Sequence, residues 1–122
     1  MLATMLQTAV TTLPVRDLDS SISFYTGVLD FRIIHRYEHI AYLAGPGATI
    51  ALRPGPTTDK PSVHIGFLVR DLKEAQRTLK QRGIMFLGDP VEASVTWVVF
   101  FNDPDGNSLY LFQWKAGVEK PL

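Results

Sequence analysis

The tetrapeptide Val15-Arg16-Asp17-Leu18 returns as Val69-Arg70-Asp71-Leu72, so the second copy begins 54 residues after the first. In both copies an apolar segment of alternating character precedes the tetrapeptide, over residues 9–14 and 63–68. Alternation with a period of two predicts a β-strand. A repeat of this length indicates that the fold is built from two similar modules.

Each tetrapeptide also predicts the start of a helix. Asp17 and Asp71 stand where an N-cap carboxylate would accept hydrogen bonds from free backbone N–H groups. The apolar residues that follow are spaced as on one face of a helix: Leu18, Ile22, Tyr25 and Leu29 in the first copy, Leu72, Ala75 and Leu79 in the second. Gly83, after a cationic last turn, is expected to end the second helix as its C′ residue.

Three further strands follow each predicted helix. They are expected at residues 31–37, 39–44 and 48–53 in the first copy and at 84–87, 95–102 and 108–114 in the second, with turns at 45–47 and 103–107. The prediction is a single domain over residues 1–122, with module one at about 7–54, a Pro-rich linker at 55–61, module two at about 62–114 and a tail at 115–122.

Composition narrows the class of protein. The chain has 122 residues, 12 Lys+Arg against 12 Asp+Glu, and no cysteine, which excludes disulfides, thiolate metal sites and thiol catalysis. A chain of this size buries about two-thirds of its surface on folding. Balanced charge argues against nucleic acid as a partner. The N-terminal residues do not have the pattern of a signal peptide and no run is long enough to span a membrane, so a cytoplasmic protein without membrane partners is expected.

The ordered motifs, together with the repeat, resemble the vicinal oxygen chelate superfamily of glyoxalases, extradiol dioxygenases, fosfomycin-resistance enzymes and bleomycin-resistance proteins. The resemblance covers about residues 7–114 and rests on residues 13–18, Ser21 with Phe24-Tyr25, residues 28–31, His64-Ile65, residues 69–72 and residues 101–107. It implies an α+β fold of two βαβββ modules whose sheets curl around a cavity, and a homodimer in which modules can associate across chains. Asp30 stands where the family usually has Gly, which is tolerable because Asp enters the left-handed region.

The resemblance also implies where a metal would bind. In metal-dependent members the ligands lie on the first and fourth strands of each module, which here gives Val10, Ala51, His64 and Tyr110. Because Val10 and Ala51 have no donor atom, and a divalent metal needs about three protein ligands, we expect neither a metal nor another cofactor.

A replacement metal site would have to come from the hairpin residues His35, Glu38 and His39. In one extended strand the two histidines would stand about 13 Å apart, at roughly 3.3 Å per residue. Only a tight turn would bring them together, so they are interpreted as exposed hairpin residues.

Strand alternation extends the implied ligand positions to a pocket. The predicted ligand-binding residues are Val10, Thr12, Ala51, Arg53, His64, Tyr110, Phe112 and Trp114, and Thr49, Gly66 and Leu68 share their face. The aromatic residues would form a flat apolar wall, with a core or dimer interface as the alternative. Arg53 is either a cation at the mouth or a solvated strand end. Trp97 and Phe100 lie on opposite faces of their strand, and the sequence does not fix which faces the pocket.

His64 and Tyr110 each have two interpretations. His64 is either a cavity-wall histidine bonded to a neighbour, or a general base or hydrogen-bond donor to a ligand, and it is the one candidate catalytic residue. Tyr110 is either a packing residue or a pocket contact.

Three functions remain open. The leading hypothesis is a metal-independent, resistance-type binder of a small, neutral or singly anionic aromatic molecule. The second is an enzyme of the same superfamily, a lyase, isomerase or dioxygenase, metal-dependent through other ligands or metal-free with His64 as base. The third is a degenerate module that dimerises or binds another protein.

Overall fold

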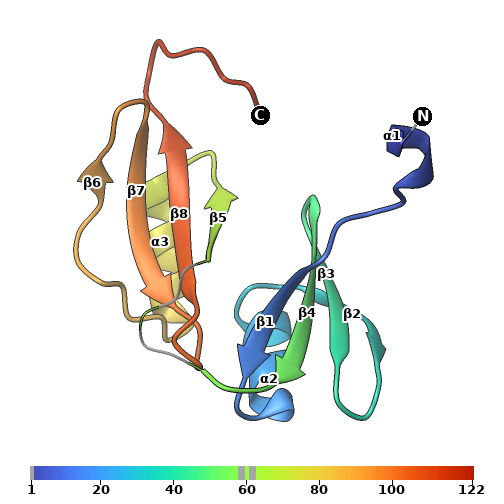
Figure 1. Ribbon diagram of the computed structural model, residues 1–122. Coiled ribbons are helices and arrows are strands. Elements are labelled where there is room, and N and C mark those ends of the chain that lie inside the picture. Colours follow the sequence, from blue (N-terminus) through green and yellow to red (C-terminus); the bar gives the residue numbers. More distant parts are fainter. Residues whose placement is uncertain (1, 58–59, 61–62) are drawn as a thin grey trace. The chain divides into compact units, whose positions relative to one another are not determined.

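The computed structural model describes residues 2–57, 60 and 63–122, and the chain divides between residues 57 and 58 into two compact units. A short helix, α1 (Leu2–Met5), precedes the first unit's sheet (Figure 1). Each unit contains a strand, a helix and three further strands, in that order. The predicted fold of two βαβββ modules is therefore confirmed. The predicted linker lies partly outside the described residues, at 58–59 and 61.

The first unit is a four-stranded mixed sheet against one helix. Its elements are β1 (Thr11–Val15), α2 (Leu18–Gly27), β2 (Arg32–Arg36), β3 (Ala41–Gly45) and β4 (Ala48–Pro54). The sheet order is β1-β4-β3-β2, with β1 parallel to β4 and the other pairs antiparallel. Leu13 and Val15 of β1 are buried, whereas Pro14 between them is half-buried and Thr12 before them is exposed, so one face of the sheet forms a core with α2.

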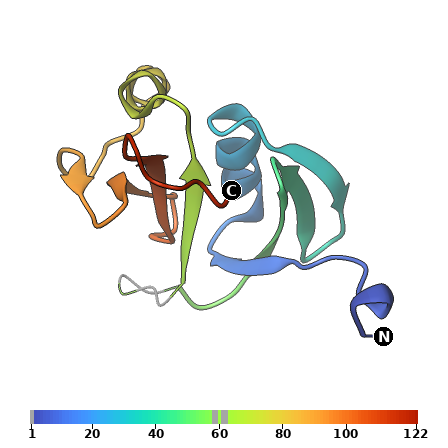
Figure 2. The ribbon, with the colours of Figure 1, turned by 90° about the horizontal axis from the view of Figure 1, so that it is seen from above.

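The second unit repeats this arrangement. Its elements are β5 (His64–Leu68), α3 (Leu72–Gln81), β6 (Val91–Glu92), β7 (Thr96–Asn102) and β8 (Ser108–Trp114). The order β5-β8-β7-β6 again has one parallel pair, β5 with β8. The apolar face of α3 covers the sheet face that carries the buried residues Val99, Phe101, Leu109 and Leu111 (Figure 2).

The local signals that predict the helix ends are confirmed. A carboxylate oxygen of Asp17 accepts from the Asp19 N–H at 3.2 Å, and Asp71 accepts from the Glu74 N–H at 3.1 Å. Gly83 follows α3 with a φ of 94°, as a C′ glycine does. Asp30 has a φ of 60°, the left-handed conformation expected of it.

One predicted strand is wrong. Residues 84–87 have no strand structure, and β6 forms instead at Val91–Glu92. Leu87 donates a backbone hydrogen bond to Phe100, but Gly88 then turns the chain with a φ of 110°. Because Pro90 lacks an N–H, strand pairing resumes only after Pro90. The other strands and helices occur where the pattern places them, with ends that differ by one or two residues.

In the described part of the chain no helix is long and apolar enough to cross a membrane.

Candidate functional site

The second sheet has a hollow on the face opposite α3. Alternation along β8 points Leu109 and Leu111 towards α3, so Tyr110, Phe112 and Trp114 point to the other side. A cavity of about 500 Å³ lies there, open to solvent, and β5, β7, β8 and the residue before β7 supply its wall. The lining residues are His64, Val95, Thr96, Val98, Phe100, Tyr110, Phe112 and Trp114.

Five of these residues form a continuous row of rings, which we call the aromatic row: His64, Phe100, Tyr110, Phe112 and Trp114. Successive ring centroids are 6.4, 5.4, 5.8 and 5.9 Å apart. These spacings fall within the range in which aromatic rings attract each other edge-to-face or at a tilt. The row therefore forms one apolar wall that crosses three strands.

Gly66 determines where the Tyr110 ring lies. The two residues are register partners on the parallel pair β5–β8. A Cβ atom built on Gly66 would lie 2.2 Å from Tyr110 Cζ, far inside van der Waals contact. The ring thus lies directly over the Gly66 backbone, and any side chain at position 66 would displace it.

His64 is held at one ring nitrogen. Its Nδ1 lies 2.6 Å from the hydroxyl oxygen of Ser108, its register partner on β8. Ser108 is buried, whereas His64 is exposed to the cavity. The contact fixes the orientation of the imidazole and leaves Nε2 as the nitrogen available to a ligand.

Trp114 lies at the other end of the row, and its indole N–H is a buried donor. Among the described residues this N–H has no hydrogen-bond partner. A buried donor without an acceptor costs about 1–3 kcal/mol, so this N–H lowers the stability of the second unit.

The predicted site residues divide between the two units. His64, Tyr110, Phe112 and Trp114 line the cavity as the pattern predicts, and Gly66 and Leu68 share their strand face. The rest belong to the first unit, where Ala51 is buried between its register partners and the others are exposed or half-buried: Val10, Thr12, Thr49 and Arg53. For the residues of both units, the role as ligand contacts stays a prediction.

Four lining residues were not assigned from the sequence: Val95, Thr96, Val98 and Phe100. Phe100 is the register partner of Tyr110, which places it on the cavity face. Trp97 consequently points to the α3 side. The alternation of residues 96–102 predicts two faces of β7, one with Trp97 and one with Phe100. Only the register of β7 with β8 shows which of these faces lines the cavity.

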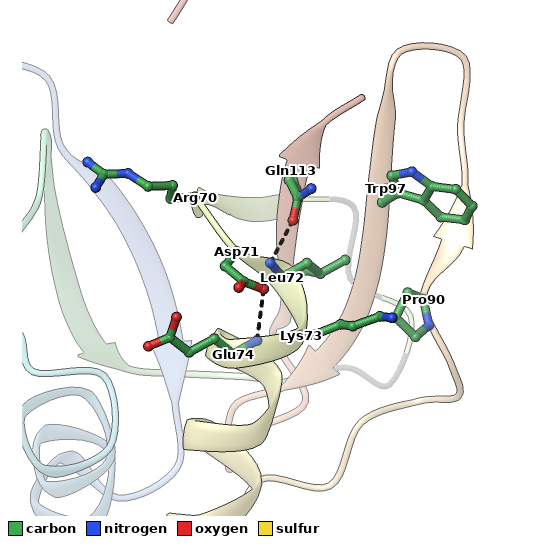
Figure 3. A pocket seen from close by; sticks show the side chains of 8 residues that line it. All are labelled: Arg70, Asp71, Leu72, Lys73, Glu74, Pro90, Trp97 and Gln113. Carbon is green, nitrogen blue, oxygen red and sulfur yellow. Dashed lines mark hydrogen bonds between the residues drawn. The ribbon is translucent and has the colours of Figure 1, made fainter. Parts of the chain in front are cut away.

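Trp97 borders a second hollow, of about 880 Å³, on the α3 side of the same unit (Figure 3). The helix start, residues 70–74, forms its other wall together with Gln113 and Pro90. Gln113 Oε1 accepts from the Leu72 N–H at 2.7 Å. Asp71 caps the same helix, as described above. Charges of both signs surround this hollow, and two of its polar side chains already bond the helix backbone.

The residues at the implied metal positions do not fit a divalent metal. Val10 and Ala51 offer no donor, which leaves one imidazole and one phenol, whose ring is packed over Gly66. The structure's described residues contain no group of three His, Asp or Glu side chains placed to hold a metal ion. In the β2–β3 hairpin, His39 Nε2 lies 3.6 Å from Glu38 Oε1, with both side chains more than 80% exposed. His35 instead packs its ring against Tyr37.

A chain of two successive βαβββ units defines a class of protein, and comparison with known families identifies that class. The model of the "Glyoxalase/Bleomycin resistance protein/Dioxygenase superfamily" matches residues 7–111. The chain belongs to that superfamily, and the resemblance to the vicinal oxygen chelate proteins is confirmed.

Individual relatives are more distant. The chain is 31% identical, over 86% of its length and 90% of the relative's, to a lactoylglutathione lyase of Escherichia coli O157:H7. A glyoxalase/bleomycin resistance protein/dioxygenase from Nocardioides has a similar structure, with a TM-score of 0.79 at 22% identity, covering 99% of this chain and 94% of the other. TnmS3, an antibiotic-binding protein from Streptomyces sp. CB03234, has a TM-score of 0.74 at 23% identity, covering 90% and 97%. At these identities the structural neighbours establish the fold alone.

Proposed function

We propose that this protein binds a small, planar, largely apolar organic molecule in the cavity of the second unit, without the metal of the metal-dependent superfamily members. The observation that supports it is the aromatic row along one wall of a cavity of about 500 Å³. A pocket of this size, apolar with a few polar groups, is typical of small-molecule sites. The face carries no charged side chain among its lining residues, which disfavours a multiply charged ligand.

The energetics of the wall favour a flat ligand. Ring pairs contribute about 0.5–1.5 kcal/mol beyond the area that they bury, and the row offers several ring faces and edges at once. One superfamily member of similar structure, TnmS3, is itself described as an antibiotic-binding protein. Ligand binding is therefore compatible with this fold.

The two tryptophans make a direct test possible, because Trp114 lines the cavity and Trp97 borders the hollow on the other side of the sheet. The variant Trp97→Phe reports on the cavity alone, and the matched variant Trp114→Phe reports on the other hollow alone. Both would be titrated with three planar, acceptor-bearing probes: 4-nitroanisole, 2-acetylnaphthalene and 1,4-naphthoquinone.

We expect at least one probe to quench Trp97→Phe saturably and Trp114→Phe only weakly. Phe112→Ala in the Trp97→Phe background should weaken that binding by about tenfold, since one aromatic contact of the row is lost. Absence of saturable quenching with all three probes would overturn the proposal, as would equal quenching of both single-tryptophan proteins.

Metal content and assembly are measured on the untreated protein. Elemental analysis with native mass spectrometry should find no stoichiometric divalent ion. It should also find the homodimer that the superfamily resemblance predicts. A bound divalent ion with His64 among its ligands would contradict the metal-free proposal.

The second candidate function is an enzyme in which His64 acts as base. It is favoured by the ordered imidazole at the cavity wall and by the relatives named lactoylglutathione lyase. An assay for lactoylglutathione lyase activity, with the parent and His64→Ala compared, tests it. Activity that disappears in the variant supports this candidate, whereas activity that is absent or unchanged counts against it.

A further inference from the structure

The direction of the hydrogen bond between His64 and Ser108 depends on which imidazole nitrogen carries the proton. A serine hydroxyl has one hydrogen to donate, and a buried donor without an acceptor is costly. Ser108 keeps only 8% of its surface exposed, and its hydroxyl oxygen lies 2.6 Å from His64 Nδ1. Donation from Ser108 to Nδ1 satisfies this hydrogen, whereas donation in the opposite direction would leave it without that acceptor.

We infer that Ser108 is a positioning residue that holds neutral His64 as the Nε2–H tautomer, so that the cavity offers a hydrogen-bond donor and selects ligands that bear an acceptor. The two ring nitrogens of a neutral imidazole differ in this way, since one donates and the other accepts. The ligand-selecting part rests on the proposed binding function. The tautomer itself does not, because it is inferred from the His64–Ser108 contact and the burial of Ser108 alone.

The inference separates the two interpretations of His64. A general base needs a free lone pair on Nε2, and so does a histidine that binds a metal through that atom. In the Nε2–H tautomer this lone pair is replaced by a proton. The same contact thus favours ligand binding over proton abstraction and over metal coordination at this nitrogen.

The cavity then presents one hydrogen-bond donor at an end of the aromatic row, the Nε2–H of His64, whereas the indole N–H of Trp114 at the other end is buried. The complementary ligand is a flat aromatic body that carries an acceptor such as a carbonyl, nitro or carboxylate oxygen. A hydrocarbon of the same shape would leave the His64 donor unpaired when it displaces water.

Long-range ¹H–¹⁵N NMR of the full chain measures the tautomer without any ligand. In alkaline buffer, where imidazoles are neutral, we expect His64 to show a pyridine-type Nδ1 and a pyrrole-type Nε2, with almost no minor tautomer. His35, which is exposed, serves as the internal control and should show a mixture. Ser108→Ala should move His64 towards that mixture, and Ser108→Thr, which keeps the hydroxyl, should restore the single tautomer.

Two results would overturn the positioning role: a protonated Nδ1 in the parent protein, or a tautomer population in Ser108→Ala equal to that of the parent. If Ser108→Ala fails to fold, the parent spectrum and Ser108→Thr still decide the question.

A matched pair of probes tests the ligand class. 4-Nitroanisole carries an acceptor that 4-ethylanisole lacks, and we expect it to bind the parent about tenfold more tightly, the size of one hydrogen bond. His64→Phe keeps a ring but removes the N–H, so the ratio of the dissociation constants of the two probes should fall towards one. A preference that persists unchanged in His64→Phe would overturn the ligand-selecting role. If neither probe binds, the ligand class fails together with the binding proposal, and the tautomer result is unaffected.

Discussion

Replacing Gly66 by Ala tests how the cavity wall is built. The new Cβ would lie 2.2 Å from Tyr110 Cζ, whereas carbon atoms in contact stand about 3.5 Å apart, so the ring must retreat by about 1.3 Å. Tyr110 is half-buried and its ring can swing into the cavity. Overpacking costs about 1–3 kcal/mol, and the entropic gain of Ala over Gly offsets about 0.5–1 kcal/mol. We therefore expect a net loss of about 1–2 kcal/mol.

Urea unfolding measures this loss. With a slope of about 2 kcal/mol per molar urea, the midpoint should fall by about 0.5–1 M. Probe binding to the Trp97→Phe form should also weaken, because the displaced ring occupies the cavity. In the double variant Gly66→Ala/Tyr110→Ala the clash cannot occur, so the two substitutions should show a coupling energy of about 1 kcal/mol or more. Additive effects, or parental stability in Gly66→Ala, would refute this description of the wall.

Gly45 provides a matched control in the first unit. A Cβ there would lie 2.5 Å from Phe31 Cζ, and the Phe31 ring is only 5% exposed. Because this ring has less room to move, Gly45→Ala should cost about 3 kcal/mol, more than Gly66→Ala. Probe binding per folded molecule should be unchanged, since neither residue lines the cavity. Loss of binding in this variant would show that the effect of Gly66→Ala is not local.

Three further predictions concern the helices. At the end of α2, a Cβ on Gly27 would meet no atom within 4 Å apart from its chain neighbours and its own helix backbone. Gly27→Ala should therefore raise stability by about 0.5–1 kcal/mol, and a lower urea midpoint would contradict this. The hydroxyl of Ser20 donates to Asp17 at 2.6 Å and holds the pKa of that carboxyl below its ordinary 3.8. The contribution of this hydrogen bond to stability is therefore present above pH 3.8 and is lost as the pH falls through the lowered pKa. NMR titration of Ser20→Ala should show that the pKa of Asp17 rises. Gln113→Ala removes the acceptor of the Leu72 N–H and should cost about 1 kcal/mol, whereas Gln113→Glu, which keeps an acceptor oxygen, should cost less; equal losses in urea unfolding would argue against this bond.

The fold was predictable because the same local signals occur twice. Alternating strands, Asp caps and helical spacing around Asp17 and Asp71 agree with one another, so each copy supports the other. The failure at residues 84–87 has a local cause. The apolar pattern there predicts a strand, but Gly88 and Pro90 move the pairing to β6, and a pattern of apolar residues does not show which of them pair.

The site was predictable only along single strands. Alternation correctly placed Tyr110, Phe112 and Trp114 on one face, together with His64 across the parallel pair. Phe100 could not be assigned because the facing side of β7 depends on its register with β8, which the turn between them sets. The Ser108 contact was missed for a similar reason, since it joins residues that are 44 positions apart.

The position of bound probe on the protein tests the central claim most directly. Backbone and indole ¹H–¹⁵N shifts of the full chain would be followed during titration with 4-nitroanisole. Binding in the cavity predicts saturable shifts at Val98, Phe100, Tyr110 and the Trp114 indole, with little change at residues 70–74 and the Trp97 indole. Shifts centred on the helix start and Trp97 instead, or no saturable shifts in the second unit, would contradict the account.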